Sequence, residues 1–167
     1  MLYNTEIEDI CQHYNIPLVA CCMKDALKDM SPVDGNYILN LASSNDPVNY
    51  KGTHFLALII RKNEAIYFDS FGVICPTEII DFVKRRHGCK LGYTTKDIQY
   101  IKSEMCGFYA VSFLKFISSS KLNIYKKTKE YLSSFDTDQK KNDAILKDFY
   151  MAYFKYPYPS AFKKILK

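Results

Sequence analysis

Residues 54–72 read HFLALIIRKNEAIYFDSFG and contain two apolar runs separated by one polar segment. After His54 the chain is apolar through residue 60, residues 61–64 are polar, and residues 65–68 are apolar again. Two short apolar runs joined by a polar turn predict an antiparallel β-hairpin. Neither run alternates between apolar and polar side chains, so both strands are expected to be buried on two faces, in the middle of a sheet.

The segments around this hairpin predict helices packed on a small sheet. Residues 106–117 are apolar almost all round, which is typical of a buried central helix. Amphipathic spacing and alternation predict the other elements. The expected helical segments are 5–14, 24–30, 76–88, 106–117, 125–135 and 140–154, the further strands are 36–41 and 98–101, and 43–52 is a polar surface loop. We therefore expect an α+β fold with a small, central, mostly antiparallel sheet flanked by helices.

Length and composition indicate one folded unit. The chain has 167 residues, of which 48% are hydrophobic and 25% charged, which excludes global disorder. One domain covering residues 1–167 is expected. No apolar run approaches the roughly 20 residues that cross a bilayer, and the first residues lack the features of a signal peptide. We expect a protein that is not secreted, has no membrane partner, and stays inside a cell or a particle.

The six cysteines do not form a recognisable metal or disulfide pattern. They stand at positions 11, 21, 22, 75, 89 and 106, without a C-x-x-C pair, and the three histidines have no zinc-ligand spacing. The even count would allow disulfides, but a reducing compartment would keep the thiols free. We expect no metal and no cofactor, and most cysteines are expected to be small buried apolar residues.

The net charge of +5 is concentrated in the last third of the chain. Residues 115–167 contain 12 lysines and 5 acidic residues, whereas residues 1–114 contain 11 basic and 13 acidic residues. Two interpretations stay open. The lysines form solvated helical faces, or the basic helical segment 115–167 binds a polyanion such as nucleic acid.

Three residues stand where a cysteine nucleophile would need them. Cys106 lies where a loop enters the central helix, so its sulfur would face the positive helix end, and Gly107 would let a substrate approach the backbone. His54 begins one strand of the hairpin and Asp69 ends the other, which places both at the same end. Each has an ordinary alternative: a core cysteine, a structural histidine and a turn-forming aspartate.

Four motifs in this order resemble those of the adenain-like cysteine proteases, the family of the adenovirus maturation protease. The similarity extends to enzymes of virophages, Polinton-like elements and large DNA viruses, and more distantly to SUMO-deconjugating proteases. It covers roughly residues 35–117. The motifs are His54-Phe55, the run YFDSFG at 67–72, Gln99, and Cys106-Gly107-Phe108-Tyr109.

This resemblance implies a role for each matching residue. Cys106 would be the nucleophile, at the N-terminus of the buried helix, and His54 the general base and acid. Asp69 would orient His54, and Gln99 would donate to the oxyanion together with the Cys106 N–H. Two positions depart from the adenovirus pattern, because Phe55 replaces a tryptophan and Asp69 a glutamate. Cys89 lies near the place where adenain pairs a cysteine with an activating peptide, although an unpaired thiol after Gly88 is the better explanation.

The implied function is that of a cysteine endopeptidase that processes viral capsid or core precursors during virion maturation. Cleavage would follow small, glycine-containing sites, inside the virion or the infected cell. Two other functions remain open. A deconjugating protease for a ubiquitin-like modifier is disfavoured by the short chain and by the seven-residue spacing from Gln99 to Cys106. A non-catalytic, polyanion-binding virion protein would use the basic segment 115–167 as its working surface.

Overall fold

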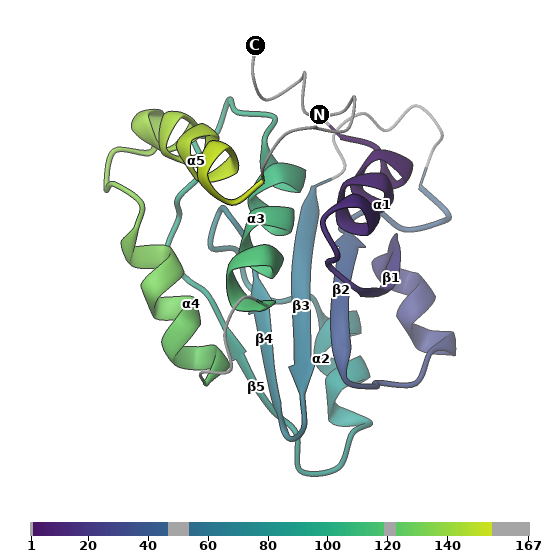
Figure 1. Ribbon diagram of the computed structural model, residues 1–167. Coiled ribbons are helices and arrows are strands. Elements are labelled where there is room, and N and C mark those ends of the chain that lie inside the picture. Colours follow the sequence, from purple (N-terminus) through teal and green to yellow (C-terminus); the bar gives the residue numbers. More distant parts are fainter. Residues whose placement is uncertain (1, 47–53, 119–122, 155–167) are drawn as a thin grey trace.

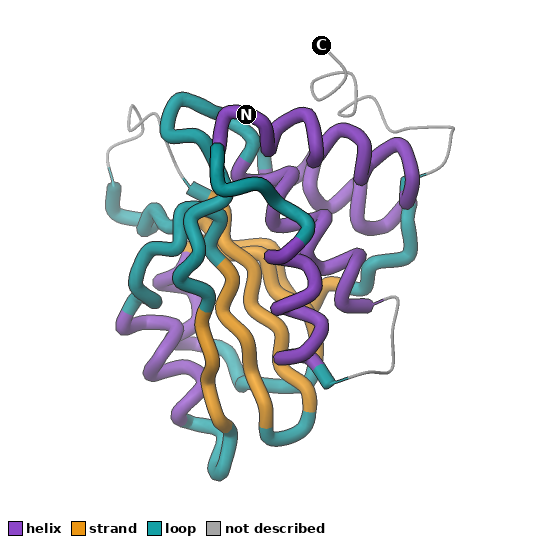
Figure 2. The backbone as a smooth tube through the Cα atoms, turned by 90° about the vertical axis from the view of Figure 1, so that its left-hand side faces the viewer, coloured by secondary structure: helices purple, strands orange, loops and turns teal. Residues whose placement is uncertain are grey.

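The computed structural model describes residues 2–46, 54–118 and 123–154, and shows a sheet of five strands with helices on both faces (Figures 1 and 2). The strands lie in the order β1-β2-β3-β4-β5. In chain order the elements are α1 (Asn4–His13), β1 (Leu18–Met23), the 3₁₀ helix η1 (Lys24–Asp29), β2 (Gly35–Asn40), β3 (Phe55–Arg61), β4 (Glu64–Phe68), α2 (Thr77–Lys84), β5 (Lys90–Tyr93), α3 (Cys106–Ser118), α4 (Ile124–Ser133) and α5 (Gln139–Tyr153).

The centre of the sheet is the predicted hairpin. β3 and β4 pair antiparallel, and Arg61 lies opposite Glu64 beside the turn. β2 pairs antiparallel with the other side of β3, whereas the two outer strands pair parallel, β1 with β2 and β4 with β5. The α+β class is thus confirmed, with a sheet that is antiparallel through its middle and parallel at both edges.

Alternate side chains of the hairpin enter two separate apolar cores, which explains why its strands do not alternate in sequence. Ala57 and Ile59 join the core under α1, α3, α4 and α5. Leu56 and Leu58 join the core under η1 and α2 on the opposite face. Both strands are therefore buried on two faces, as predicted.

Helix α3 is the centre of the larger core. Ten of its thirteen residues are buried. The ring of Phe113 stacks on Phe68 of β4 at 4.3 Å between centroids. Aromatic stacking in an offset geometry adds to the free energy of burial. This packing holds the first residue of α3 in a fixed position relative to the sheet.

One sequence prediction on this side of the fold is wrong, and one strand was not predicted. Residues 98–101 do not form a strand, because the N–H groups of Ile98 and Gln99 both donate to one carbonyl oxygen, that of Ser70. The fifth strand is β5, whose short segment Lys90–Tyr93 carries no apolar alternation. Its Gly92 is required by tertiary packing, since a Cβ there would lie 2.6 Å from the Tyr125 ring.

The remaining helices agree with the predicted segments within a few residues, and the predicted loop 43–52 lies mostly outside the described residues. Among the described segments, no helix has both the length and the apolar character needed to span a bilayer.

Candidate active site

Three elements bring the predicted site residues to one end of the sheet. β3 begins immediately after His54, β4 ends immediately before Asp69, and α3 begins at Cys106 and packs on β3. In Figure 1 this is the end at which the β3 arrow starts. The arrangement of consecutive antiparallel strands explains why residues 15 positions apart in sequence meet there.

His54 and Asp69 are directly bonded. The imidazole Nε2 lies 2.9 Å from Asp69 Oδ1, and the side chains of the two residues are 12% and 1% exposed. A carboxylate only accepts, so Nε2 carries the proton and Nδ1 remains to exchange a proton with a substrate or a thiol. The ring of Phe71 lies 4.8 Å from the His54 ring, between centroids, and covers it.

Asp69 is itself oriented by two further donors. Its Oδ1 accepts the backbone N–H of Phe71 at 2.7 Å, and its Oδ2 accepts the hydroxyl of Tyr67 at 3.0 Å. Every oxygen of this buried carboxylate therefore has a partner, which fixes the direction from which it faces His54. Tyr67 and Phe71 belong to the YFDSFG run, but their support of Asp69 became visible only in the folded chain.

The charges of His54 and Cys106 are mutually stabilised. Burial alone would lower the pKa of His54, but its hydrogen bonds with Asp69 and Cys106 and their negative charges raise it from 6.5 to about 9. Burial alone would raise the pKa of the Cys106 thiol. Hydrogen bonds from His54 and from the backbone N–H groups of Phe55 and Gly107, with the charge of His54, lower it below 9.0. A thiolate–imidazolium pair is the state these interactions favour.

Cys106 differs in this respect from every other cysteine, all of which are described. Burial raises the pKa of Cys11, Cys21 and Cys75 to about 12, and it also raises the pKa of Cys22 and Cys89. All six thiols are free in this structure, Cys89 included. Cys106 alone combines burial with a partner histidine and the positive end of a thirteen-residue helix.

Gln99 is held rigidly in the segment that leads into Cys106. It is 1% exposed. Its Oε1 accepts the hydroxyl of Ser70 at 2.6 Å, and its Nε2 donates to the Ser103 carbonyl at 2.7 Å. A carbonyl can only accept, so the orientation of the amide is determined and one N–H of Nε2 remains for another acceptor. No sequence signal pointed to Ser103.

Gly107 serves a different purpose from the one predicted. A Cβ at this position would lie 3.3 Å from side-chain atoms of Leu2 and 3.4 Å from Ile7. The direction in which a side chain would project is therefore filled by the N-terminal segment and α1. The glycine allows α1 to pack against the beginning of α3, and the prediction that it opens the backbone to substrate is wrong.

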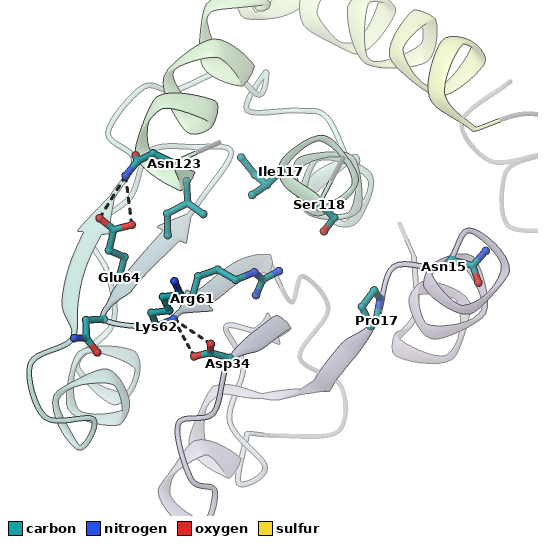
Figure 3. A pocket seen from close by; sticks show the side chains of 11 residues that line it. Asn15, Pro17, Asp34, Arg61, Lys62, Glu64, Ile117, Ser118 and Asn123 are labelled. Carbon is teal, nitrogen blue, oxygen red and sulfur yellow. Dashed lines mark hydrogen bonds between the residues drawn. The ribbon is translucent and has the colours of Figure 1, made fainter. Parts of the chain in front are cut away.

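A cavity of about 800 Å³ lies at the opposite end of the sheet, near the hairpin turn and the start of α4 (Figure 3). Its carboxylates are bonded to neighbouring lining residues, since Asp34 accepts the backbone N–H of Lys62 at 3.0 Å and Glu64 accepts from the Asn123 amide at 3.4 Å. Arg61 donates to Asn36 at 2.6 Å. None of the four predicted site residues lines it, so its size does not mark the reactive centre.

Comparison with solved structures identifies the fold. Two crystal structures of the African swine fever virus (ASFV) pS273R protease, one with selenomethionine, match with a TM-score of 0.60 at 16% identity. Each alignment covers 93% of this chain, and 68% and 67% of those chains. The chain has the fold of the pS273R protease. ChlaDub1 from Chlamydia trachomatis aligns over 95% of this chain and 81% of its own, at 13% identity and a TM-score of 0.44. Neither a family model nor a curated protein sequence matches.

The expected protease fold is therefore confirmed by structural comparison at a sequence identity of only 16%.

Proposed function

We propose that this protein is a cysteine endopeptidase with Cys106 as nucleophile, His54 as general base and acid, and Asp69 as the residue that orients His54. One observation carries the proposal. Of six cysteines, the one whose pKa is lowered begins a buried helix and interacts with a histidine bonded to a buried carboxylate. A nucleophile, a base and a group that orients the base are the parts that covalent acyl transfer requires.

Each group then has one task. The Cys106 thiolate attacks the scissile carbonyl carbon, and the charge that develops on the carbonyl oxygen is stabilised by the Cys106 N–H and by Gln99 Nε2. The His54 imidazolium gives its proton to the leaving amine as the carbon–nitrogen bond breaks, which leaves a thioester. Water, deprotonated by His54, then hydrolyses the thioester, which releases the acid product and restores the thiolate–imidazolium pair of Cys106 and His54.

The substrates we propose are capsid or core precursors of a virus or virus-like element, cut after small glycine-containing sites in the virion or the infected cell. The likeness of the fold to a viral protease supports this source. A peptide panel tests it. Peptides with Gly-Gly or Gly-X-Gly before the cut site are incubated with the protein and the products mapped by mass, beside a ubiquitin-like modifier joined through an isopeptide bond. Cleavage of the isopeptide alone would replace the endopeptidase proposal with deconjugation.

Peptide cleavage is expected to follow a bell-shaped pH profile. The acid limb reports formation of the Cys106 thiolate, whose pKa lies below 9.0, and the alkaline limb reports loss of the His54 proton, whose pKa is about 9. Both charges must coexist, so kcat/KM rises with pH through the first value and falls through the second. Measurement from about pH 5 to pH 10 would show both limbs.

The Asp69→Asn variant provides the matched test of this profile. The bond to Asp69 is among the interactions that raise the pKa of His54. Its loss is therefore expected to move the alkaline limb to lower pH and to reduce the maximal rate. An alkaline limb that stays in place would show that Asp69 does not stabilise the charged imidazole.

The basic C-terminal third is less uniformly charged than its composition suggests. Between residues 123 and 154 the chain has six lysines and five acidic residues. Lys127 already forms an ion pair, with Nζ 2.9 Å from the Glu130 carboxylate, and the same Nζ lies 4.7 Å from the Phe116 ring centroid. Lys126 and Lys129 are exposed on α4. We propose that these two lysines contribute to sequence-independent DNA binding that keeps the enzyme near packaged substrates.

Replacing both Lys126 and Lys129 by glutamine is expected to reduce the salt dependence of DNA binding. For every phosphate that the protein no longer neutralises, the slope of log K against log[salt] decreases by about 0.9 on duplex DNA. The measurement is a fluorescence titration at several salt concentrations. Lys141→Gln is the control, because Lys141 already lies 3.6 Å from Asp136. Absence of DNA binding by the unaltered protein at low salt would contradict the proposal.

A further inference from the structure

The segment that carries Gln99 has almost no support of its own. Residues 94–105 lie in neither a helix nor a strand. Toward the sheet, Ile98 and Gln99 donate their N–H groups to the Ser70 carbonyl. Within the segment, one turn is closed by the Ser103 N–H donating to the Tyr100 carbonyl at 2.7 Å. A segment with so few internal bonds takes its position from the elements on both of its sides, the sheet on one and the helices that pack on the other.

The end of α4 is attached to the start of this segment. The ammonium group of Lys96 donates to the carbonyl oxygens of Leu132 and Phe135, both at 2.9 Å. Leu132 lies in the last turn of α4 and Phe135 just beyond its end, where a positive charge near the helix carbonyls is favourable. These two hydrogen bonds therefore stabilise the end of α4 and also fix the position of Lys96.

The start of α5 is attached to the middle and the end of the segment. Asn142, which is fully buried, donates from Nδ2 to the Ile98 carbonyl at 2.9 Å, and its Oδ1 accepts the Asp136 N–H. Asp143 Oδ1 accepts the Ser103 hydroxyl at 3.1 Å. The contacts with Ile98 and Ser103 bracket Gln99, and the carbonyl of Ser103 is the group that holds its amide.

Asp143 also connects this segment to the helix of the nucleophile. The same Oδ1 accepts the hydroxyl of Tyr109, one turn into α3, at 3.1 Å. One carboxylate oxygen thus joins Ser103, which holds Gln99, to α3, which begins with Cys106. In Figure 1, α5 lies at the end of the sheet where α3 begins.

From these contacts we infer that the α4–α5 junction positions the oxyanion donor, with Asp143 and Asn142 as positioning residues that act on Gln99 through Ser103 and Ile98. The inference rests on the proposed function, because it matters to catalysis only if Gln99 donates to the oxyanion. It assigns to the C-terminal third a task in the reaction that is independent of its lysines. Asp143 and Asn142 touch neither His54 nor Asp69 through any hydrogen bond of the described residues.

Kinetics of three variants test the inference. Asp143→Ala removes the acceptor of Ser103 and Tyr109, and Ser103→Ala removes only the hydroxyl donor while the carbonyl that holds Gln99 remains. Both are expected to lower kcat on a Gly-Gly peptide by about 10- to 100-fold with KM little changed, because a displaced catalytic group costs about that much. Asp143→Asn retains an acceptor oxygen and is expected to recover most of the rate.

A control on the same helix separates positioning from stability. Leu146→Val shortens a buried side chain of α5 that faces the core, and is expected to lower the melting temperature without changing kcat. The rate of Cys106 alkylation by iodoacetamide is expected to stay unchanged in all variants, since that reaction uses the thiolate pair but no oxyanion donor. Wild-type kcat in both Asp143→Ala and Ser103→Ala would overturn the inference.

A measurement that does not depend on turnover tests the positioning role of Asp143 separately from the proposed protease function. The side-chain amide of Gln99 gives a pair of signals in a ¹⁵N-correlated spectrum, assigned by their loss in Gln99→Ala. Asp143→Ala is expected to shift or broaden this pair, whereas Leu146→Val leaves it in place. If the unaltered protein cleaves no peptide, the proposed function fails. In that case an unmoved Gln99 pair in Asp143→Ala would also overturn the positioning role, and a displaced pair would support it.

Discussion

Cys106→Ala is expected to remove peptide cleavage while the protein remains folded. In the proposed mechanism the thiolate bonds to the substrate carbonyl, and loss of the nucleophile in such a hydrolase costs about 10⁶-fold in kcat. The fold should tolerate the change, because the substitution removes one sulfur at the first position of α3 and leaves the aromatic packing of that helix intact. Cleavage of a Gly-Gly peptide and the melting temperature measure the two effects.

Cys75→Ala is the matched control, since Cys75 is equally buried, 4% exposed against 5%, and burial raises the pKa of its thiol to about 12. This variant is expected to lose some stability and to keep its turnover. Cleavage by Cys106→Ala at the rate of the unaltered protein would end the assignment of Cys106 as nucleophile. Loss of turnover in Cys75→Ala at full stability would point to a second functional thiol.

Gln99→Ala is expected to lower kcat by about 10²- to 10³-fold, equivalent to about 2.7–4 kcal/mol of transition-state stabilisation, with a smaller change in KM. The amide of Gln99 is held by Ser70 and Ser103 before any substrate binds, so in the proposed mechanism it would donate to the oxyanion without reorganisation. Steady-state kinetics on the same peptide separates the two parameters. Gln12→Ala, at an exposed position of α1, serves as the control and is expected to change neither.

An increase in KM with unchanged kcat would instead make Gln99 a residue that binds substrate and transition state equally. The Asp143→Ala result would then have to be interpreted in the same way, because both variants act on one amide.

The amino-acid sequence by itself determined the central hairpin and the buried helix, and it singled out the four candidate site residues. The hairpin and the helix could be predicted because apolar patterning is local, so that residues 54–69 and 106–117 indicate their elements without knowledge of their neighbours. The placement of His54 and Asp69 at the same end followed from the length of the hairpin, and the structure has the two side chains 2.9 Å apart.

The tertiary structure alone decided how distant segments complete these elements. Residues 98–101 have the composition of a strand, but their N–H groups turn to the Ser70 carbonyl, and the sheet is completed by β5 because Tyr125 of α4 covers Gly92. The lowered pKa of Cys106 has the same origin. The sequence marks Cys106 as the cysteine that begins the central helix, but its pKa is lowered only because β3 brings His54 and the Phe55 N–H against its sulfur. The pattern of apolar and polar residues sets where the chain turns and which segments are buried. The pKa values and the loop positions depend on charges and hydrogen-bond donors that only folding brings together.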